Sequence, residues 1–571
     1  MASIRIYLGD WLKNAAIIGL IKVLSRKETN ENRIKSKNDY IEFDSSLLEN
    51  FEETYFEVLI EKNENTLPWH KLVSCESELD NILENTFTKK SIERVNSIIE
   101  DFKSKLTSNS YKNGYLILDN STDLIELEKK LKKIKLTKKE EVEDVKDDII
   151  NQITIIKDII KYLRKPEVKR VLAAKNVMYN VIQNFWNNIS FFYKDNNKGD
   201  MYELYKKDFI EPALNYIEKD NKKNKYTCFT CDNKISKLNK PEAYDLTWLV
   251  KIGVDGSRKS SHFWNMQNDA YICPICNILY SCLPLGFKTI RNKGIFINNN
   301  KNIKTLKTSN ITKEIIKEEN FHEIEQMSYL NVANSMEQSN IENLDKEFEN
   351  IQVIKIDGDN ATRPYSFNVL SRSLLYLVYK NRKTLNNLIK ITVRITDKYS
   401  LNLYDEVISR LYDGKNLFDL ISKLLTMYLD EKFYGLYYIY KILEINNSII
   451  GGAKMNYKET GKFKNYGMKL RKAYIQKNAT SKLPGITYRL LNALKTKDSG
   501  KFLDTLINAY MYMKIEIPTE FVKVLNNQDV LQEVGYAFLI GLQGLDEENK
   551  EDIKNKEKVK NEGEEKWRKK D

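Results

Sequence analysis

Four cysteines in two close pairs are the residues of this chain best suited to chemistry. Cys228 and Cys231 form one Cys-x-x-Cys motif, and Cys273 and Cys276 form the second. The two-residue spacing lets one tight turn direct both sulfurs at the same ion, and two such turns complete a tetrahedron. Thiolates are soft ligands, and four of them leave no open position for water. The pattern therefore predicts a structural Zn²⁺ site.

A redox dithiol and a catalytic zinc are the two alternatives for these cysteines. A thioredoxin-like dithiol needs a strand–helix context that the sequence does not show, and two such motifs in one chain are unusual. A zinc deaminase needs a proline ahead of its cysteine pair, whereas Pro274 lies inside the pair. The 41 residues between the pairs exceed the usual zinc-ribbon spacing, so we expect a small subdomain there. Cys75 and Cys282 are expected to be spare thiols.

Other catalytic motifs are not assembled by the sequence. Gly256 and Gly461 each lack the partners of a phosphate-binding loop, and His322 does not begin a His-Glu-x-x-His motif. The three histidines lie far apart in the chain, with no paired nucleophile or base. Asp357 and Asp359 flank a glycine, which is typical of a turn. We therefore expect a protein that is not an enzyme.

The second chemical feature is positive charge gathered near the C-terminal end. Between Lys454 and Lys514, fourteen basic residues stand against three acidic ones, giving a net charge of +11 of the chain's total of +12. A helix here would have an apolar face and an opposite cationic face, which we expect to bind a phosphate backbone without reading bases. An acidic protein or an anionic lipid is the alternative partner. The predicted nucleic-acid contacts are Lys454, Lys462, Lys464, Lys469, Arg471, Lys472, Lys482, Arg489, Lys495 and Lys497.

Two weaker basic sites flank the second cysteine pair. Arg258 and Lys259 precede it on an expected loop, and Lys288, Arg291 and Lys293 follow it. Either group is a candidate DNA contact. Aromatic residues between the C-terminal cations are candidates for stacking on bases, or else core residues: Tyr457, Phe463, Tyr466, Tyr474 and Tyr488.

Composition and periodicity predict a mostly helical α+β protein of several domains. The 571 residues include 42% apolar and 30% charged residues, but only 21 glycines and 9 prolines. Residues 3–8 alternate as a strand does, and Asp10 can cap a helix that starts at Trp11. A second short strand is expected over residues 115–118, and one helix is expected to include Phe367 and Leu370. The longest early apolar run, over residues 15–21, is far shorter than the roughly 20 residues of a spanning helix, so we expect a cytoplasmic protein.

These patterns divide the chain into six segments. We expect a mixed α/β domain, a zinc-binding and zinc-ribbon-like insertion, a loop-rich linker that returns to the core, a helical domain, a basic helical bundle and a charged, disordered tail. In this order the segments are 1–225, 226–297, 298–364, 365–450, 451–545 and 546–571.

Three stretches together resemble the CXXC–CXXC family of CRISPR proteins, the large subunit of the type I-B Cascade, an RNA-guided DNA surveillance complex. One is the pair of cysteine motifs. The others are the opening stretch Tyr7-Leu8-Gly9-Asp10-Trp11-Leu12 and the late stretch Gly485-Ile486-Thr487-Tyr488-Arg489-Leu490. The resemblance touches both ends and the middle of the chain. It leaves residues 25–225 and 298–450 without a recognised counterpart.

The resemblance implies a non-catalytic subunit for antiviral defence. It would bind crRNA and target DNA, contact the protospacer-adjacent motif (PAM), and stabilise the R-loop. Its implied partners are a backbone subunit, a 5′-handle-binding subunit, a small subunit and a recruited helicase-nuclease. The C-terminal bundle resembles the small subunit, and Met455 or Met468 could start a separate copy. The alternatives are a zinc-containing nucleic-acid-processing enzyme, such as a nuclease or an RNA-modifying protein, and a zinc-stabilised protein-interaction platform.

Overall fold

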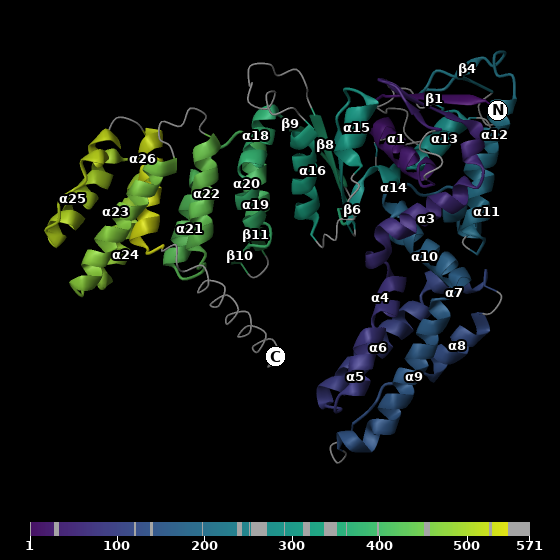
Figure 1. Ribbon diagram of the computed structural model, residues 1–571, viewed down its shortest axis with the longest axis horizontal. Helices are drawn as coiled ribbons and strands as arrows, with labels where there is room; N and C mark the ends of the chain where they lie inside the picture. The colour runs from purple at the N-terminus through teal and green to yellow at the C-terminus, as the bar shows by residue number, and fades with distance from the viewer. Residues whose placement is uncertain are drawn as a thin grey trace. The chain divides into compact units, whose positions relative to one another are not determined.

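The computed structural model shows a mostly helical protein with small sheets (Figure 1). It forms two compact units: unit 1 holds residues 1–324 and 348–369, and unit 2 holds residues 325–347 and 370–571. The predicted α+β, mostly helical class is confirmed. The residues that the structure describes are 2–27, 33–118, 121–136, 141–196, 198–236, 243–250, 252, 271–290, 292–311, 320–335, 351–360, 363–396, 399–449, 457–524 and 528–545. The segment 546–571, expected to be a disordered tail, lies outside them.

Unit 1 begins with the strand and helix that the sequence predicts. Strand β1 (Ser3–Tyr7) pairs antiparallel with β3 (Tyr40–Asp44), which also pairs with β2 (Lys35–Ser36). The Asp10 carboxylate accepts a hydrogen bond from the Lys13 amide at 2.8 Å and caps α1 (Trp11–Leu24). The apolar residues of α1 are spread over most of its circumference, so the helix has no continuous polar face. It is buried along nearly its whole length.

Two glycines bring α1 against the chain that follows the second cysteine pair. That chain forms α13 (Pro274–Ser281) and α14 (Leu283–Gly286). A Cβ atom on Gly19 would lie 1.9 Å from the Cys282 carbonyl oxygen, and one on Gly286 would lie 2.1 Å from the Ala15 carbonyl oxygen. Only hydrogen fits at both positions, so the two backbones touch directly.

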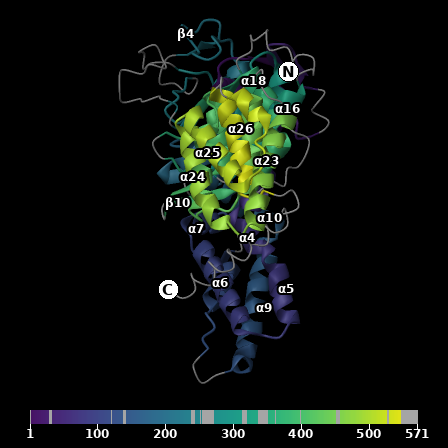
Figure 2. The ribbon, with the colours of Figure 1, turned by 90° about the vertical axis from the view of Figure 1, so that its left-hand side faces the viewer.

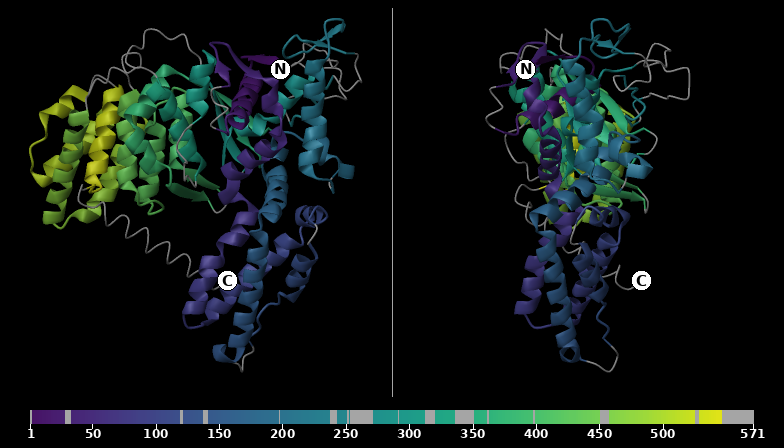
Figure 3. Two further views of the ribbon diagram at one scale, coloured as in Figure 1. Left: turned by 45° about the vertical axis from the view of Figure 1, so that its right-hand side comes forward. Right: turned by 90° about the vertical axis from the view of Figure 1, so that its right-hand side faces the viewer.

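The helices of unit 1 between residues 51 and 218 include those of a helical arm, residues 69–172. The arm has its own hydrophobic core, and its long helices α6 and α9 lie alongside each other (Figure 3). The helices are α3 (Phe51–Asn63), α4 (Pro68–Ser74), α5 (Glu76–Glu84), α6 (Lys89–Leu106), α7 (Asn109–Tyr115), α8 (Ser121–Lys130), α9 (Lys146–Leu163), α10 (Pro166–Asn180), α11 (Met201–Tyr205) and α12 (Glu211–Glu218).

The strand predicted over residues 115–118 is wrong. Tyr115 ends α7, and its buried hydroxyl donates to the Leu106 carbonyl oxygen at 2.8 Å. A short apolar run fits a strand or a helix end equally well, and packing against α6 decides the outcome.

A second sheet completes unit 1. Its strands follow the order β6-β7-β8-β9, and β7 pairs antiparallel with both β6 and β8. The segment 298–364, expected to be loop-rich, contributes β8 and two helices in its described residues. The bounds are β6 (Lys288–Ile290), β7 (Lys293–Asn298), α15 (Ile303–Asn310), α16 (Phe321–Ser335), β8 (Ile351–Asp357) and β9 (Tyr365–Leu370). Helix α16 begins in unit 1, but its residues from Glu325 onward belong to unit 2.

The described residues of unit 2 form helices and one hairpin, β10–β11 (Figure 2). The prediction that Phe367 and Leu370 lie in a helix is wrong: both belong to β9, and the helix α18 starts at Arg372. The bounds are α18 (Arg372–Lys380), α19 (Arg382–Leu388), β10 (Thr392–Thr396), β11 (Tyr399–Asn402), α20 (Leu403–Tyr412), α21 (Phe418–Leu429), α22 (Leu436–Ile449), α23 (Tyr457–Gln476), α24 (Leu483–Lys495), α25 (Ser499–Met513) and α26 (Gln528–Leu542). Among the helices that the structure describes, none is long and apolar enough to cross a membrane.

Gly19→Ala and Gly286→Ala are expected to destabilise unit 1 by about 3 kcal/mol each, because the added methyl group forces two backbones apart. Five of the six tryptophans precede residue 265, so urea unfolding followed by tryptophan fluorescence reports on this unit. Gly461→Ala in α23 is the control, since nothing lies within 4 Å of its Cβ position. Equal midpoints for all three variants would contradict the prediction.

Candidate metal centre and nucleic-acid interface

The first cysteine pair occupies the loop of a small hairpin. Strands β4 (Tyr226–Thr227) and β5 (Lys234–Ile235) pair antiparallel, and Cys228 and Cys231 lie between them. The Cys228 amide donates to the Asn233 carbonyl oxygen at 2.8 Å. The Asp232 amide in turn donates to the Cys228 carbonyl oxygen at 3.0 Å, with Asp232 at a φ of 58°. These bonds close the tight turn that aims two sulfurs in one direction.

The second pair lies at the beginning of α13. Cys273 is the N-cap residue, and its sulfur accepts from the Cys276 amide at 3.5 Å. Pro274 takes the first helical position, where a fixed φ is favourable and no amide is needed. The positive end of a helix dipole favours thiolates, so this position would stabilise the two sulfurs once a metal ion has displaced their protons.

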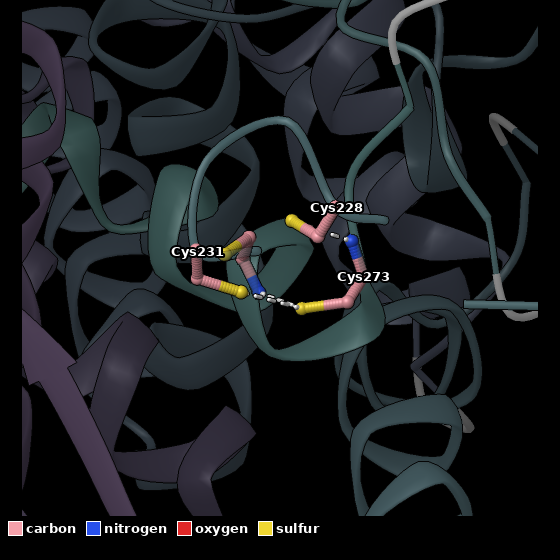
Figure 4. A group of neighbouring side chains, drawn as sticks. Cys228, Cys231 and Cys273 are labelled. Atoms are coloured by element: carbon pink, nitrogen blue, oxygen red, sulfur yellow. Dashed lines mark hydrogen bonds between the residues drawn. The ribbon is translucent and has the colours of Figure 1, made fainter. Parts of the chain in front are cut away.

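The hairpin and the helix bring all four sulfurs together (Figure 4). The four Sγ atoms lie within 4.8 Å of one another, and the Sγ atoms of Cys231 and Cys273 are 3.6 Å apart. The Cys273 amide also donates to the Cys228 sulfur at 3.2 Å. Cys228, Cys273 and Cys276 are buried, whereas Cys231 is half-buried. The four predicted ligands therefore form a set that could hold a metal ion.

The pKa values of Cys228, Cys273 and Cys276 depend on one another. Hydrogen bonds from the other three cysteines, Cys231 first, lower the pKa of Cys228 well below its ordinary value. Hydrogen bonding to the Cys228 thiolate raises the pKa of both Cys273 and Cys276. Without a cation, one thiolate is therefore held by the protons of its neighbours. A divalent ion would replace those protons and let all four sulfurs ionise.

Two residues that the sequence analysis missed fix the hairpin in place. The Lys13 ammonium, on the buried helix α1, donates to the Thr230 carbonyl oxygen at 3.1 Å. The Tyr216 hydroxyl, on α12, donates to the Lys234 carbonyl oxygen at 2.6 Å. Both contacts join residues far apart in sequence, and no local pattern marks either residue.

The two remaining cysteines are separate from this set. Cys282 is buried, and its thiol lies 3.4 Å from the Ile278 carbonyl oxygen. Cys75 lies half-buried in the helical arm. Burial raises the pKa of Cys75 to about 11, which keeps the thiol protonated at neutral pH.

The exposed part of the predicted cationic strip lies on α23 and α24 and the turns beside them. Lys454 is outside the described residues. No carboxylate of a described residue pairs with the exposed cations of this strip. These exposed cations are Lys462, Lys469, Lys472, Lys482, Arg489, Lys495 and Lys497.

Two members of the predicted strip are not on its exposed face. Lys464 is only 6% exposed, and its ammonium lies 4.9 Å from the centre of the Tyr440 ring. The Arg471 guanidinium donates to the Leu542 carbonyl oxygen at 3.1 Å, at the C-terminal end of α26. Both side chains lie on the side of α23 that packs against α26, so they are covered by that helix. A Cβ atom on Gly541 would lie 1.9 Å from the Lys464 carbonyl oxygen. The prediction of an outward position is wrong for Lys464 and holds only in part for Arg471, which is half-buried.

The two weaker basic sites beside the second cysteine pair are described only in part. Arg258, Lys259 and Arg291 lie outside the described residues. Lys288 is buried, with its ammonium 3.4 Å from the Ser309 carbonyl oxygen, so the expected DNA contact is wrong for this side chain. Lys293 is exposed and lies 3.7 Å from the Asp357 carboxylate.

Two of the five predicted stacking residues belong to the core, and a third is half-buried. Phe463 and Tyr474 are buried, and the Tyr466 hydroxyl bonds to Glu520. Tyr488 is 37% exposed, and the side chain of Tyr457 is outside the description.

A different aromatic residue lies among the cations. Tyr512 is 43% exposed, with the Lys482 ammonium 3.7 Å from its ring centre. Hydrogen bonding to Lys482 lowers the pKa of Tyr512. No cation lies between Phe502 and Met513 in the sequence, so no local pattern marks Tyr512; its cationic neighbours Lys477 and Lys482 come from an earlier part of the chain.

Comparison with known proteins points to one family. Residues 221–288 match the family described as CRISPR-associated protein (Cas_CXXC_CXXC). The matched segment contains all four cysteines of the candidate metal centre. Comparison with curated proteins and with solved structures gives no match. The family match supports a CRISPR-associated protein with a role in CRISPR defence.

Buried Lys288 belongs to a group of three lysines in unit 1. Lys22 donates to the Leu285 carbonyl oxygen at 2.9 Å, and Lys62 donates to the Phe287 carbonyl oxygen. Desolvation, together with the charge of Lys288, lowers the pKa of Lys62 to about 7. Desolvation also lowers the pKa of Lys22. Lys22 and Lys62 therefore release protons in the folded protein at a lower pH than in the unfolded chain.

The free energy of unfolding of unit 1 is expected to rise between pH 7 and about pH 10, because the unfolded chain then binds more protons than the folded one. Lys62→Met should reduce this rise, whereas Lys89→Met at an exposed position should leave it unchanged. Urea unfolding at several pH values, followed by tryptophan fluorescence, measures the difference. A pH dependence that is the same in both variants would rule out the assigned role of Lys62.

Proposed function

We propose that this chain is the non-catalytic large subunit of a type I-B CRISPR surveillance complex, which binds crRNA and target DNA. The observation that carries the proposal is the coincidence of the assembled four-cysteine set with the CRISPR-associated family match over residues 221–288. The resemblance at both ends of the chain supports the finer assignment to Cascade. PAM contact, R-loop stabilisation and recruitment of a helicase-nuclease belong to the proposed role through that resemblance.

Zn²⁺ is the metal that the four thiolates suit best. Four sulfur ligands complete a tetrahedral shell, so no position remains for water or substrate. Burial of three of the cysteines fits a structural centre. The ion would tie the β4–β5 hairpin to the start of α13, and the chain's own contribution is to hold the two turns face to face. The centre would thus give rigidity rather than chemistry.

The exposed cations of α23 and α24 are the proposed nucleic-acid interface. Lysine and arginine contacts to phosphate position a strand without specifying its sequence. That property suits a guided complex, in which base pairing with the RNA supplies the specificity. Tyr512 lies among these cations and could stack on an unpaired base, a contact worth roughly 1–3 kcal/mol.

The purified chain is expected to contain about one Zn²⁺ per molecule, because two cysteine pairs make one tetrahedral set. Cys231→Ser and Cys276→Ser should each lower the zinc content and the thermal stability, whereas Cys75→Ser should change neither. Elemental analysis by mass spectrometry gives the metal content, and differential scanning calorimetry gives the stability. Full zinc content in Cys276→Ser would refute the assignment of this ligand.

The triple variant Lys462→Glu, Lys469→Glu and Lys472→Glu should weaken binding of single-stranded DNA by about tenfold or more, because three phosphate contacts are lost. The slope of log K against log salt should also fall by roughly two units. Fluorescence anisotropy with a labelled oligonucleotide measures both quantities. The matched control places the same charge change on exposed lysines of the arm, as Lys89→Glu, Lys90→Glu and Lys132→Glu. Equal affinities of the two triple variants would refute the interface.

A further inference from the structure

Strand β1 has one unpaired edge in the described sheet. Its only described neighbour is β3, and the register places Ser3 opposite Asp44 and Tyr7 opposite Tyr40. The Leu8 amide donates to the Asp39 carbonyl oxygen at 2.8 Å, and the Ala2 carbonyl oxygen accepts from the Ser45 amide at 3.0 Å. The even-numbered residues of β1 therefore bond to β3.

The backbone groups of Ser3, Arg5 and Tyr7 point the other way, because antiparallel pairing alternates along a strand. Among the described residues, none bonds to these outward amides and carbonyls.

A groove of about 760 Å³ follows this free edge. It is lined by every residue from Ser3 to Leu8. The side chains of β1 alternate between exposed and buried positions, so they point to opposite faces of the sheet. A single groove that meets all of these residues must therefore run along the backbone edge and not across either face.

The candidate metal centre forms the opposite wall of the groove. Thr230, Cys231, Asp232 and Asn233 come from the hairpin loop, while Ile275 and Leu279 come from α13. Lys13 lines the groove as well, but its ammonium is bonded to the Thr230 carbonyl oxygen. The metal ligands thus fix the wall that faces the edge strand.

We propose that this groove binds an extended peptide segment of a partner protein, which adds a strand to β1. A peptide backbone is the polymer whose amides and carbonyls repeat at the spacing that Ser3, Arg5 and Tyr7 present. Alternate side chains of the peptide would meet Ile275 and Leu279. The site adds a protein-docking role to the proposed nucleic-acid function.

The charges of the groove favour a peptide with a basic residue and disfavour nucleic acid. Asp232 is exposed on the groove wall and has no ion-pair partner among the described residues. The cations nearby are already engaged, since Arg5 lies 3.3 Å from Glu42 and Lys13 bonds to Thr230. A phosphate backbone would face an unpaired carboxylate, whereas a lysine or arginine of a peptide would pair with it.

The test selects peptides from a displayed library of random twelve-residue sequences on the immobilised, zinc-loaded full-length chain. Enriched peptides should alternate apolar residues and carry a lysine or arginine. Synthetic copies should lose affinity by about tenfold or more when alternate backbone amides are N-methylated, because the strand hydrogen bonds are lost. Asp232→Asn should weaken binding of the peptides that carry the basic residue.

Arg5→Pro and Arg5→Ala form a matched pair of variants. Both remove the side chain and its bond to Glu42, but only proline removes the outward amide, at an edge position where the ladder to β3 is spared. Arg5→Pro should abolish binding that Arg5→Ala retains, with equal zinc content showing that the fold is kept. If Arg5→Pro does not fold, the N-methylated peptides give the same test on the unaltered chain.

Three results would overturn the proposal. One is a selection that enriches no peptide above the bare support. Another is peptide binding that is insensitive to both N-methylation and Arg5→Pro. The third is a competition result: oligouridine displaces the bound peptide, and the Arg5→Pro variant no longer binds oligouridine. Together these two observations would make the groove a nucleic-acid site.

Discussion

Direct contact between two backbones is the constraint on which unit 1 depends. Gly19 and Gly286 let α1 touch the chain just beyond α13, at a distance that no side chain allows. Because Cys273 and Cys276 begin α13, the same contact sets where that helix starts. From the other end of α1, Lys13 reaches the carbonyl oxygen of Thr230 between the first two cysteines. One buried helix therefore aligns both halves of the candidate metal centre.

The electrostatics of that centre explain why a cation is expected there. Four sulfurs within 4.8 Å of one another cannot all carry negative charge in a buried site without a compensating ion. In the protein alone, the Cys228 thiolate is balanced by protons on its neighbours. A metal removes the need for this sharing and locks the hairpin to the helix. The rigid wall that results faces the free edge of β1, so the proposed docking groove and the metal centre depend on the same geometry.

Local patterns were enough to predict the parts whose chemistry is local. The Cys-x-x-Cys spacing, the Asp10 cap and the alternation in β1 each depend on neighbours in sequence, and each is found in the structure. Lys464 and Lys288 were misplaced because their burial depends on distant partners. The glycine that brings α26 onto α23 lies more than seventy residues beyond Lys464. The edge of β1 that no described strand covers could not be predicted either, since it depends on which strands pair.

The burial of Lys464 sharpens the argument for the cationic face. Its ammonium lies over the Tyr440 ring and its aliphatic stem is buried, so its charge takes part in a cation–π contact within unit 2. Arg471 similarly neutralises the negative end of α26. The exposed cations that the structure describes on α23, at positions 462, 469 and 472, recur at helical spacing on the side away from α26. Covering one side of α23 thus separates structural from exposed charge, and a bound strand would follow the exposed side.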